Sequence, residues 1–389
     1  MAERIDNPLL SAVMRRVRQA RPLQPDQLRF VVRPDRSNGL SFAEIWFSTA
    51  GCSHDGRGGC TMCNYGRRRP ISGDDMVEAV RQGLVGAAPG VDELLVSPSG
   101  SMLDPREVPP AARRRIFALI SEFPATRYTL ETRADSITPE IVDELIASIP
   151  GKGLAIEIGL ESSSAWVQRF CLNKGEHPDQ FTVAINLLVS KHIEVYANVI
   201  LGAPFLEPAE AIQDAVRSAR WALAQGALAA VLFPIHVKPY TLLAWLYERQ
   251  LYRPPSLWSL IESLHRLGAN LSSRVTISWY RNYYTDKWKV IASPTTCPTC
   301  REAVLNLLDE YRAQRSWAVV QELVALDCAC KEEWRRTLET PPITGLPERV
   351  ISLYRELALF FLRSGWWDRN GTGISRAVCA AYPGALMDG

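Results

Sequence analysis

The chain has 389 residues, of which 47% are hydrophobic and 22% charged, and this ordinary globular composition excludes a largely disordered protein. Lysine and arginine number 44 against 42 acidic residues, so the overall charge provides no general attraction to nucleic acid or to an anionic membrane. The sequence contains neither a secretory signal nor an apolar stretch of bilayer length, and we expect a cytoplasmic protein with no membrane partner.

Short β-rich runs alternate with helix-length amphipathic stretches between residues 42 and 238, which predicts parallel strands joined by crossover helices. The strand interiors read as apolar on both faces over much of their length. No seventh or eighth βα unit is evident, so we expect an α/β fold, a partial (βα)6 barrel whose function lies at the carboxyl ends of its strands. The six predicted strands are 43–48, 93–97, 127–132, 154–160, 195–201 and 230–236.

Three regions are predicted along the chain. Residues 1–41 are a helical, proline-interrupted lead-in, and residues 42–240 form the partial barrel. Residues 241–389 form a mainly helical C-terminal extension, in which several tryptophans are expected to serve core and inter-domain packing.

Three of the nine cysteines, Cys52, Cys60 and Cys63, follow directly after the first predicted strand. The segment is rich in glycine, so its backbone can wrap closely around an inorganic centre. A [4Fe–4S] cluster held by three thiolates leaves one iron open to a small molecule. Zinc is the alternative, with His54 as the fourth ligand that such a site would need.

The C-x7-C-x2-C spacing resembles the radical SAM signature in a widened form, the usual spacing being C-x3-C-x2-C. Wider spacings occur in several branches, including the catalytic subunit of the elongator complex. Over roughly residues 40–335 the chain resembles one branch closely, the one that contains the radical SAM subunit of archaeosine synthase. The motifs that carry this resemblance are SPSGSMLDPREVP (97–109), LETRADSI (130–137), IEIGLESSS (156–164) and NKG (173–175), together with the stretches ending LFPIHVKPYT and YRPPSLWS.

The resemblance implies that S-adenosylmethionine (SAM) chelates the open iron and is split by an electron into a 5′-deoxyadenosyl radical, which abstracts hydrogen. A reducing partner such as flavodoxin or ferredoxin would supply the electron. At the methionine end the resemblance implicates Ser99, Gly100 and Ser101, although the acidic third residue usual there is absent. The other implied SAM contacts are Glu131 and Arg133 (methionyl carboxylate), Glu161 (ribose or methionine), and Met62, Tyr65 and the strand-five segment 199–202, with Gly202 (adenine).

Each of these positions also has a purely structural interpretation. Glu131 and Arg133 can pair at a strand end, Glu161 can cap the helix that follows it, and Gly100 can simply turn the chain. Their shared location at strand ends favours the functional interpretation.

A second cysteine group, Cys297, Cys300, Cys328 and Cys330, lies in the extension. Four thiolates suffice for a site of their own, and this can be a closed zinc site or an auxiliary [4Fe–4S] cluster. Four free thiols packed in the core are the third interpretation.

We expect hydrogen abstraction from a small-molecule substrate, followed by fragmentation of the C–N lyase type or by oxidation. The archaeal relatives imply the alternative, the same chemistry on a lysine-modified deazaguanine in tRNA. A different class, a non-catalytic zinc-bearing binding module, is weighed against both. The residues singled out as possible substrate contacts are the arginines 67–69, His236, Lys238, Tyr240 and Arg253.

Overall fold

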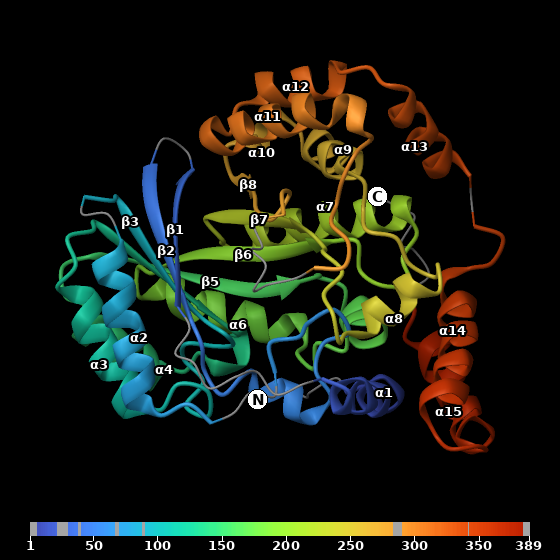
Figure 1. Cartoon of the computed structure of the whole chain (residues 1–389), viewed down its shortest axis with the longest axis horizontal. Coiled ribbons are helices and arrows are strands. Elements are labelled where there is room, and N and C mark those ends of the chain that lie inside the picture. Colours follow the sequence, from blue (N-terminus) through green and yellow to red (C-terminus); the bar gives the residue numbers. More distant parts are fainter. Residues whose placement is uncertain are drawn as a thin grey trace.

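A single eight-stranded sheet forms the centre of the computed structural model (Figure 1), with the strands arranged in chain order from β1 to β8. The structure describes residues 6–21, 30–37, 40–66, 70–87, 90–282, 290–340 and 342–383. The strands are β1 (Phe30–Ser37), β2 (Leu40–Phe47), β3 (Glu93–Pro98), β4 (Arg127–Thr132), β5 (Gly153–Glu161), β6 (Glu194–Leu201), β7 (Ala229–Pro234) and β8 (Val275–Ile277).

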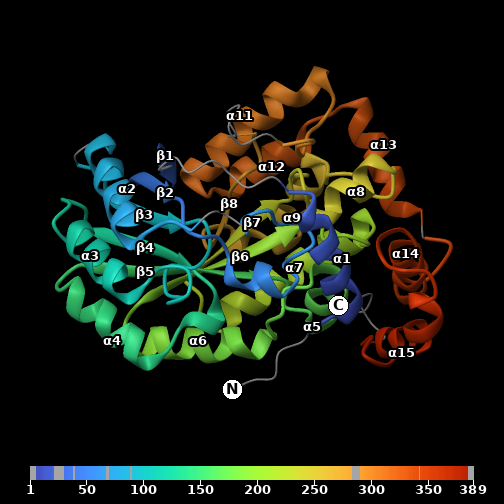
Figure 2. The same cartoon turned by 60° about the horizontal axis from the view of Figure 1, so that its bottom comes forward.

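Strands β2 to β8 are all parallel, and the sheet curls into a half-barrel with helices on its outer side (Figure 2). The predicted fold class, an α/β partial barrel with a helical C-terminal region, is confirmed, and so are all six predicted strands. Two strands were missed. The antiparallel β1 lies in the segment predicted as a helical lead-in and contains Pro34, which an edge strand tolerates, and β8 has only three residues.

The main hydrophobic core lies between the sheet and the crossover helices. Alternate strand residues such as Ile45, Leu130 and Ile156 are fully buried against these helices, as the two-residue period of a strand requires. The crossover helices are α2 (Gly73–Gly86), α3 (Pro110–Ser121), α4 (Pro139–Ser148), α6 (Pro178–Ser190) and α7 (Pro208–Ala224), with the short α5 (Ala165–Val167) and the turns η1 (Ser53–Arg57), η2 (Ala134–Ser136) and η3 (Gln168–Leu172).

The expectation of strands that are apolar on both faces is wrong for the concave face. Residues that alternate with the core positions are polar there, and they pair with one another across neighbouring strands: Glu131 is in register with Glu157, and Glu157 with Tyr196. A curled sheet buries its convex face under helices, whereas its concave face surrounds a space in which polar side chains remain partly accessible.

The C-terminal extension is mainly helical, as predicted, and contributes to two cores. Helices α11 and α12 join the core of the half-barrel, whereas α14 and α15 pack with the N-terminal α1 in a second core. No described helix combines the length and apolar character that a bilayer crossing requires. The helices are α1 (Pro8–Gln19), α8 (Leu242–Glu248), α9 (Leu257–Leu267), α10 (Ala269–Ser272), α11 (Pro298–Gln314), α12 (Trp317–Ala325), α13 (Ala329–Glu339), α14 (Leu346–Phe361) and α15 (Trp366–Ala380).

Candidate cofactor site at the strand ends

The first three cysteines lie on one loop after β2, which we call the cysteine loop (residues 51–66). The loop closes on itself, because the Cys52 amide donates to the Tyr65 carbonyl (3.3 Å) and the Cys63 amide to the Cys60 carbonyl (3.2 Å). At the closure Gly51 has a φ of 98°, and a Cβ atom there would lie 2.8 Å from the Tyr65 carbonyl oxygen. Only glycine fits this position without strain.

Helix α1 and the residues that follow it pack against the cysteine loop and support it. At Gly58, where φ is 141°, a Cβ atom would lie 2.8 Å from Ser11 of α1. The buried Asp55 pairs with Arg18 and, at 3.6 Å, with Arg21. Burial raises the pKa of Asp55, and the two arginines oppose that shift. The N-terminal segment, predicted as a lead-in, is therefore part of the loop's support.

The NKG segment after η3 holds the other side of the loop. The Asn173 side chain donates to the Gly59 carbonyl (2.8 Å), and the Thr61 amide donates to the Leu172 carbonyl (2.9 Å). His54 is buried with its Nε2 atom 2.8 Å from the Asn173 carbonyl oxygen. That nitrogen faces a carbonyl rather than the thiols, which weakens the zinc interpretation of this loop.

Burial governs the acidity of two of the thiols. It raises the pKa of Cys52 to about 11, against the opposing charge of Arg133, and raises the pKa of Cys60 well above its usual value, against the charge of Lys174. The charge of Cys63 contributes to both shifts, so the three sulfurs lie within electrostatic reach of one another. Positive charge from bound iron would offset this penalty, and three thiols without a fourth fit a cluster with one open iron.

Arg133 directs its whole guanidinium group toward this region. Each of its five N–H groups has an acceptor, so its predicted contact with a methionyl carboxylate would require an exchange of partners. The described ion pairs of Arg133 do not include Glu131, which argues against simple pairing of those two residues. The acceptors are Glu107 (2.6 Å) and Cys52 Sγ (3.3 Å) for Nη1, Asp104 (2.6 Å) and Ser53 Oγ (3.2 Å) for Nη2, and Asp135 (3.1 Å) for Nε.

Glu107 is a site residue that the sequence analysis missed. Its carboxylate accepts from the Ser101 amide (2.6 Å) and the Ser53 amide (2.7 Å), linking the end of β3 to the cysteine loop. A Cβ atom at Gly100 would lie 2.0 Å from Glu107 Oε2. A carboxylate therefore does lie beside the tripeptide 99–101, although it comes from Glu107, further along the 97–109 motif.

The two serines of this tripeptide are completely buried, and their hydroxyl groups have partners in the protein. Ser99 Oγ accepts from the Thr49 amide (2.8 Å), and Ser101 Oγ contacts the Thr132 hydroxyl. At the end of β6, Gly202 has a φ of 97°, and its carbonyl accepts from the Tyr252 hydroxyl (2.8 Å). These residues fix the strand ends in place, and any SAM contacts would come from their backbone.

Glu161 ends β5 in a strained conformation. Its φ is 67°, the strand register shifts just before it, and Lys174 Nζ lies 3.1 Å from its carboxylate. A non-glycine residue in this region costs about 1 kcal/mol or more, and such strain is typical of functional sites. Ser164, not Glu161, caps the following helix.

Glu131 and Tyr65 face the same side of the sheet. The Ser97 hydroxyl donates to Glu131, and burial raises the pKa of Glu131 to about 7. Lys238 Nζ lies 4.5 Å from the centroid of the Tyr65 ring, a cation–π contact. Met62 is half-buried and packs against the second core.

The chain is similar in sequence to two archaeal proteins of the same name, although no family model matches it. Archaeosine synthase subunit beta of Methanosarcina acetivorans is 29% identical over 309 residues, which cover 78% of this chain and 87% of that protein. The protein of the same name from Thermococcus kodakarensis is 25% identical over 297 residues, covering 72% and 86%.

The chain resembles archaeosine synthase subunit beta. This confirms the resemblance to that branch that was predicted from the cysteine spacing and the motifs. Among solved structures, the archaeal Elp3 of Methanocaldococcus infernus aligns with a TM-score of 0.45 and 14% identity, over 61% of this chain and 58% of that one.

The residues singled out as possible substrate contacts differ in their surroundings. His236 has its Nε2 atom 2.6 Å from the Trp279 carbonyl oxygen and its Nδ1 atom 3.0 Å from Ser293 Oγ. Burial lowers the pKa of His236 to about 4, so it is neutral at pH 7 and fixed by its neighbours. Tyr240 and Arg253 are exposed, and residues 67–69 lie outside the described residues.

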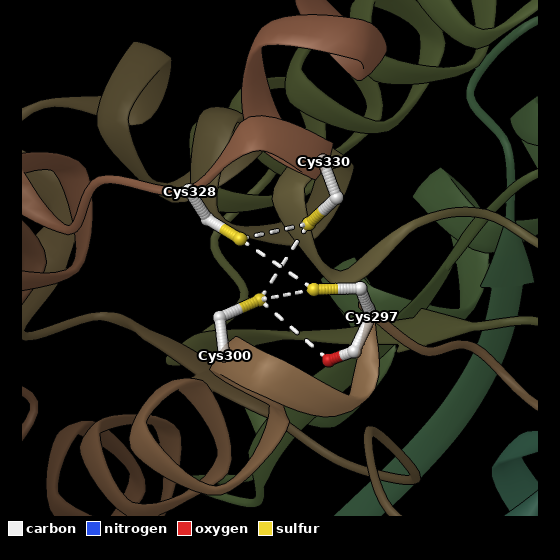
Figure 3. Close-up of side chains that lie close together, drawn as sticks. All are labelled: Cys297, Cys300, Cys328 and Cys330. Carbon is white, nitrogen blue, oxygen red and sulfur yellow. Dashed lines mark hydrogen bonds between the residues drawn. The ribbon is translucent and has the colours of Figure 1, made fainter.

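The second cysteine group forms a tight four-sulfur arrangement, which we call the tetrathiolate site (Figure 3). Four pairs of its sulfurs lie 3.5–3.6 Å apart, and all four sulfurs lie within 4.8 Å of one another. A tetrahedral ion with metal–sulfur bonds of about 2.3 Å places its sulfurs about 3.8 Å apart. In a [4Fe–4S] cluster each thiolate binds a different iron, which separates the sulfurs further. The arrangement fits a single ion.

Proposed function

We propose that the chain is a radical SAM enzyme. Cys52, Cys60 and Cys63 hold a [4Fe–4S] cluster whose open iron binds SAM, and reductive cleavage of SAM supplies a 5′-deoxyadenosyl radical that abstracts hydrogen from a small-molecule substrate. Fragmentation of the C–N lyase type or oxidation follows. The observation that carries this proposal is a braced loop of three thiols at the carboxyl end of β2, within electrostatic reach of one another.

The protein's own contribution is to position the reactants and to tune the site. Arg133 donates to Cys52 Sγ, and a hydrogen bond to a cluster sulfur ligand raises the reduction potential. Glu161, held by Lys174, would contact the ribose or the methionine. Met62 and Tyr65 flank Cys63, where the adenine would lie.

Anaerobic reconstitution with iron and sulfide tests this proposal. The expected product is a brown protein that converts SAM to 5′-deoxyadenosine when dithionite, reduced flavodoxin or reduced ferredoxin is added. Alanine at Cys52, Cys60 or Cys63 should remove both the iron and the cleavage. The matched control is Cys379→Ala, because Cys379 is exposed on α15. Full iron content and cleavage in Cys60→Ala would refute the assignment.

A second candidate substrate is a modified tRNA nucleotide. The observation that favours it is the similarity to archaeosine synthase subunit beta, at 29% identity over 78% of the chain. A salt-sensitive gel shift with bulk tRNA supports this candidate, since phosphate contacts weaken steeply with salt. No shift at low salt excludes it. Deuterium transferred from a labelled substrate into 5′-deoxyadenosine would identify the attacked carbon.

For the tetrathiolate site we propose zinc that stabilises the helical extension, rather than an auxiliary cluster. Zinc is redox-inert and closes a tetrahedral four-thiolate site, which agrees with the short sulfur–sulfur distances. Cys297 caps α11 and Cys328 caps α13, so one ion would tie the starts of two helices together. A colourless zinc protein that does not cleave SAM would instead support a non-catalytic binding module.

A further inference from the structure

The concave face of the half-barrel carries Glu157, a carboxylate that the proposed SAM chemistry does not use, beside Glu131, which the resemblance implicates as a SAM contact. Glu157 lies on β5, four residues before its end, and is in register with Glu131 on β4. Both side chains keep part of their surface accessible. Because neighbouring strands are about 4.8 Å apart, the two carboxylates extend side by side from the same face of the sheet.

The positive charge near these two carboxylates does not offset the cost of burying them in ionised form. Among the described residues Glu157 forms no ion pair, and its recorded partner is a hydrogen bond from Asn198 on β6. Burial, together with the charge of Glu131, raises the pKa of Glu157 to about 8. The pKa of Glu131 rises to about 7, mainly through burial, despite the nearby charge of Lys238. A cation at this place would relieve an electrostatic penalty that the chain itself leaves in place.

An independent feature points to a ligand with hydrogen-bond donors. Asn198 is only 5% exposed, and its side-chain oxygen, Oδ1, has no hydrogen-bond partner. A buried acceptor without a partner costs about 1–3 kcal/mol. Asn198 Oδ1 therefore completes a group of three acceptor side chains, with Glu131 and Glu157, that we call the acceptor triad.

The acceptor triad does not have the form of a metal site. Over the part of the chain that the structure describes, the tetrathiolate site is where three or more His, Cys, Asp or Glu side chains converge closely enough for one metal ion. The acceptor triad has only two such side chains, and no third described carboxylate converges with them. An ammonium group has three N–H donors and no acceptor, so it can satisfy three separated acceptors.

We propose that Glu131, Glu157 and Asn198 bind an organic ammonium group of the substrate inside the half-barrel. The inference rests on the proposed function, because it assigns the substrate class of that same site. SAM also carries an ammonium group, but in the proposed site Cys52, Cys60 and Cys63 would hold the cluster that anchors its methionine, after the end of β2. Glu157 lies four residues before the end of β5 and Asn198 three residues before the end of β6, roughly 10 Å from those ends at about 3.3 Å per residue, whereas Glu131 lies one residue before the end of β4. The substrate is therefore the source we assign.

Binding of 1,5-diaminopentane to the full-length reconstituted protein tests the proposal, with 1,5-pentanediol as the uncharged probe of equal length. We expect calorimetry to detect the diamine and not the diol. Glu157→Gln should weaken diamine binding about tenfold or more, because it removes a charge-assisted contact. Asn198→Ala should weaken it as well. Glu248→Gln, at an exposed position on α8, is the matched control.

Equal binding of diol and diamine, no diamine binding to the wild-type protein, or unchanged binding to both triad variants would overturn the proposal. Equilibrium dialysis with SAM distinguishes the two sources of ammonium. A loss of SAM affinity in Glu157→Gln, with diamine binding intact, assigns the acceptor triad to SAM and also overturns it. Formation of 5′-deoxyadenosine by the wild-type protein reports separately on the proposed function.

Discussion

The tetrathiolate site closes a long chain segment, and its removal should have a measurable cost. Cys300 is in the first turn of α11 and Cys328 caps α13, so a shared ion cross-links a loop of roughly 30 residues. By loop-closure entropy, a cross-link of this length stabilises the folded state by about 4 kcal/mol. In a chain of this size that corresponds to a fall in Tm of about 5 °C. We expect Cys300→Ser to show this fall.

Metal analysis and thermal unfolding of the same preparations provide the assay. Wild-type protein purified without reconstitution should contain one zinc per chain, and Cys300→Ser none. Reconstituted Cys300→Ser should keep the iron of the first site and its SAM cleavage. Cys379→Ser is the control, because Cys379 is exposed and far from Cys300 in sequence.

Two results would refute this reasoning. If Cys300→Ser loses four irons and four sulfides while the zinc content is unaffected, the tetrathiolate site holds an auxiliary cluster. If Cys300→Ser loses its zinc and the Tm does not move, the ion does not constrain the extension.

Three further predictions concern the half-barrel. Arg133→Lys should lower SAM cleavage about tenfold or more in a product assay, since lysine replaces five fixed donors by three mobile ones. Gly58→Ala should reduce the iron content by forcing a Cβ atom against Ser11, whereas Gly56→Ala, which has open space around it, should not; equal iron contents would contradict this. Because the pKa of Glu157 is raised in the native state, the native protein keeps a proton that the unfolded chain releases. The stability that this proton contributes at pH 4 to 5 is lost as the pH rises through about 8. Urea unfolding of Glu157→Gln, whose side chain does not titrate, should therefore show a weaker decline of stability with pH.

The local patterns of the sequence determined the repeated βα architecture and the two cysteine groups. Strand and helix periodicities depend on near neighbours, and thiols held for a metal are recognisable by their spacing, so six strands and the tetrathiolate site were predictable. The strand β1 was not, because an edge strand with Pro34 lacks a buried strand's signal.

Tertiary structure alone decided which side chains surround the site. Glu107 contacts Gly100 around a turn and also the distant cysteine loop. Helix α1 supports that loop through Ser11, which is far from it along the chain. The polar character of Glu157 was visible in the sequence, but the face to which it belongs depends on how the sheet curls. Curvature arises from packing of the whole sheet against its helices, and no local pattern encodes it.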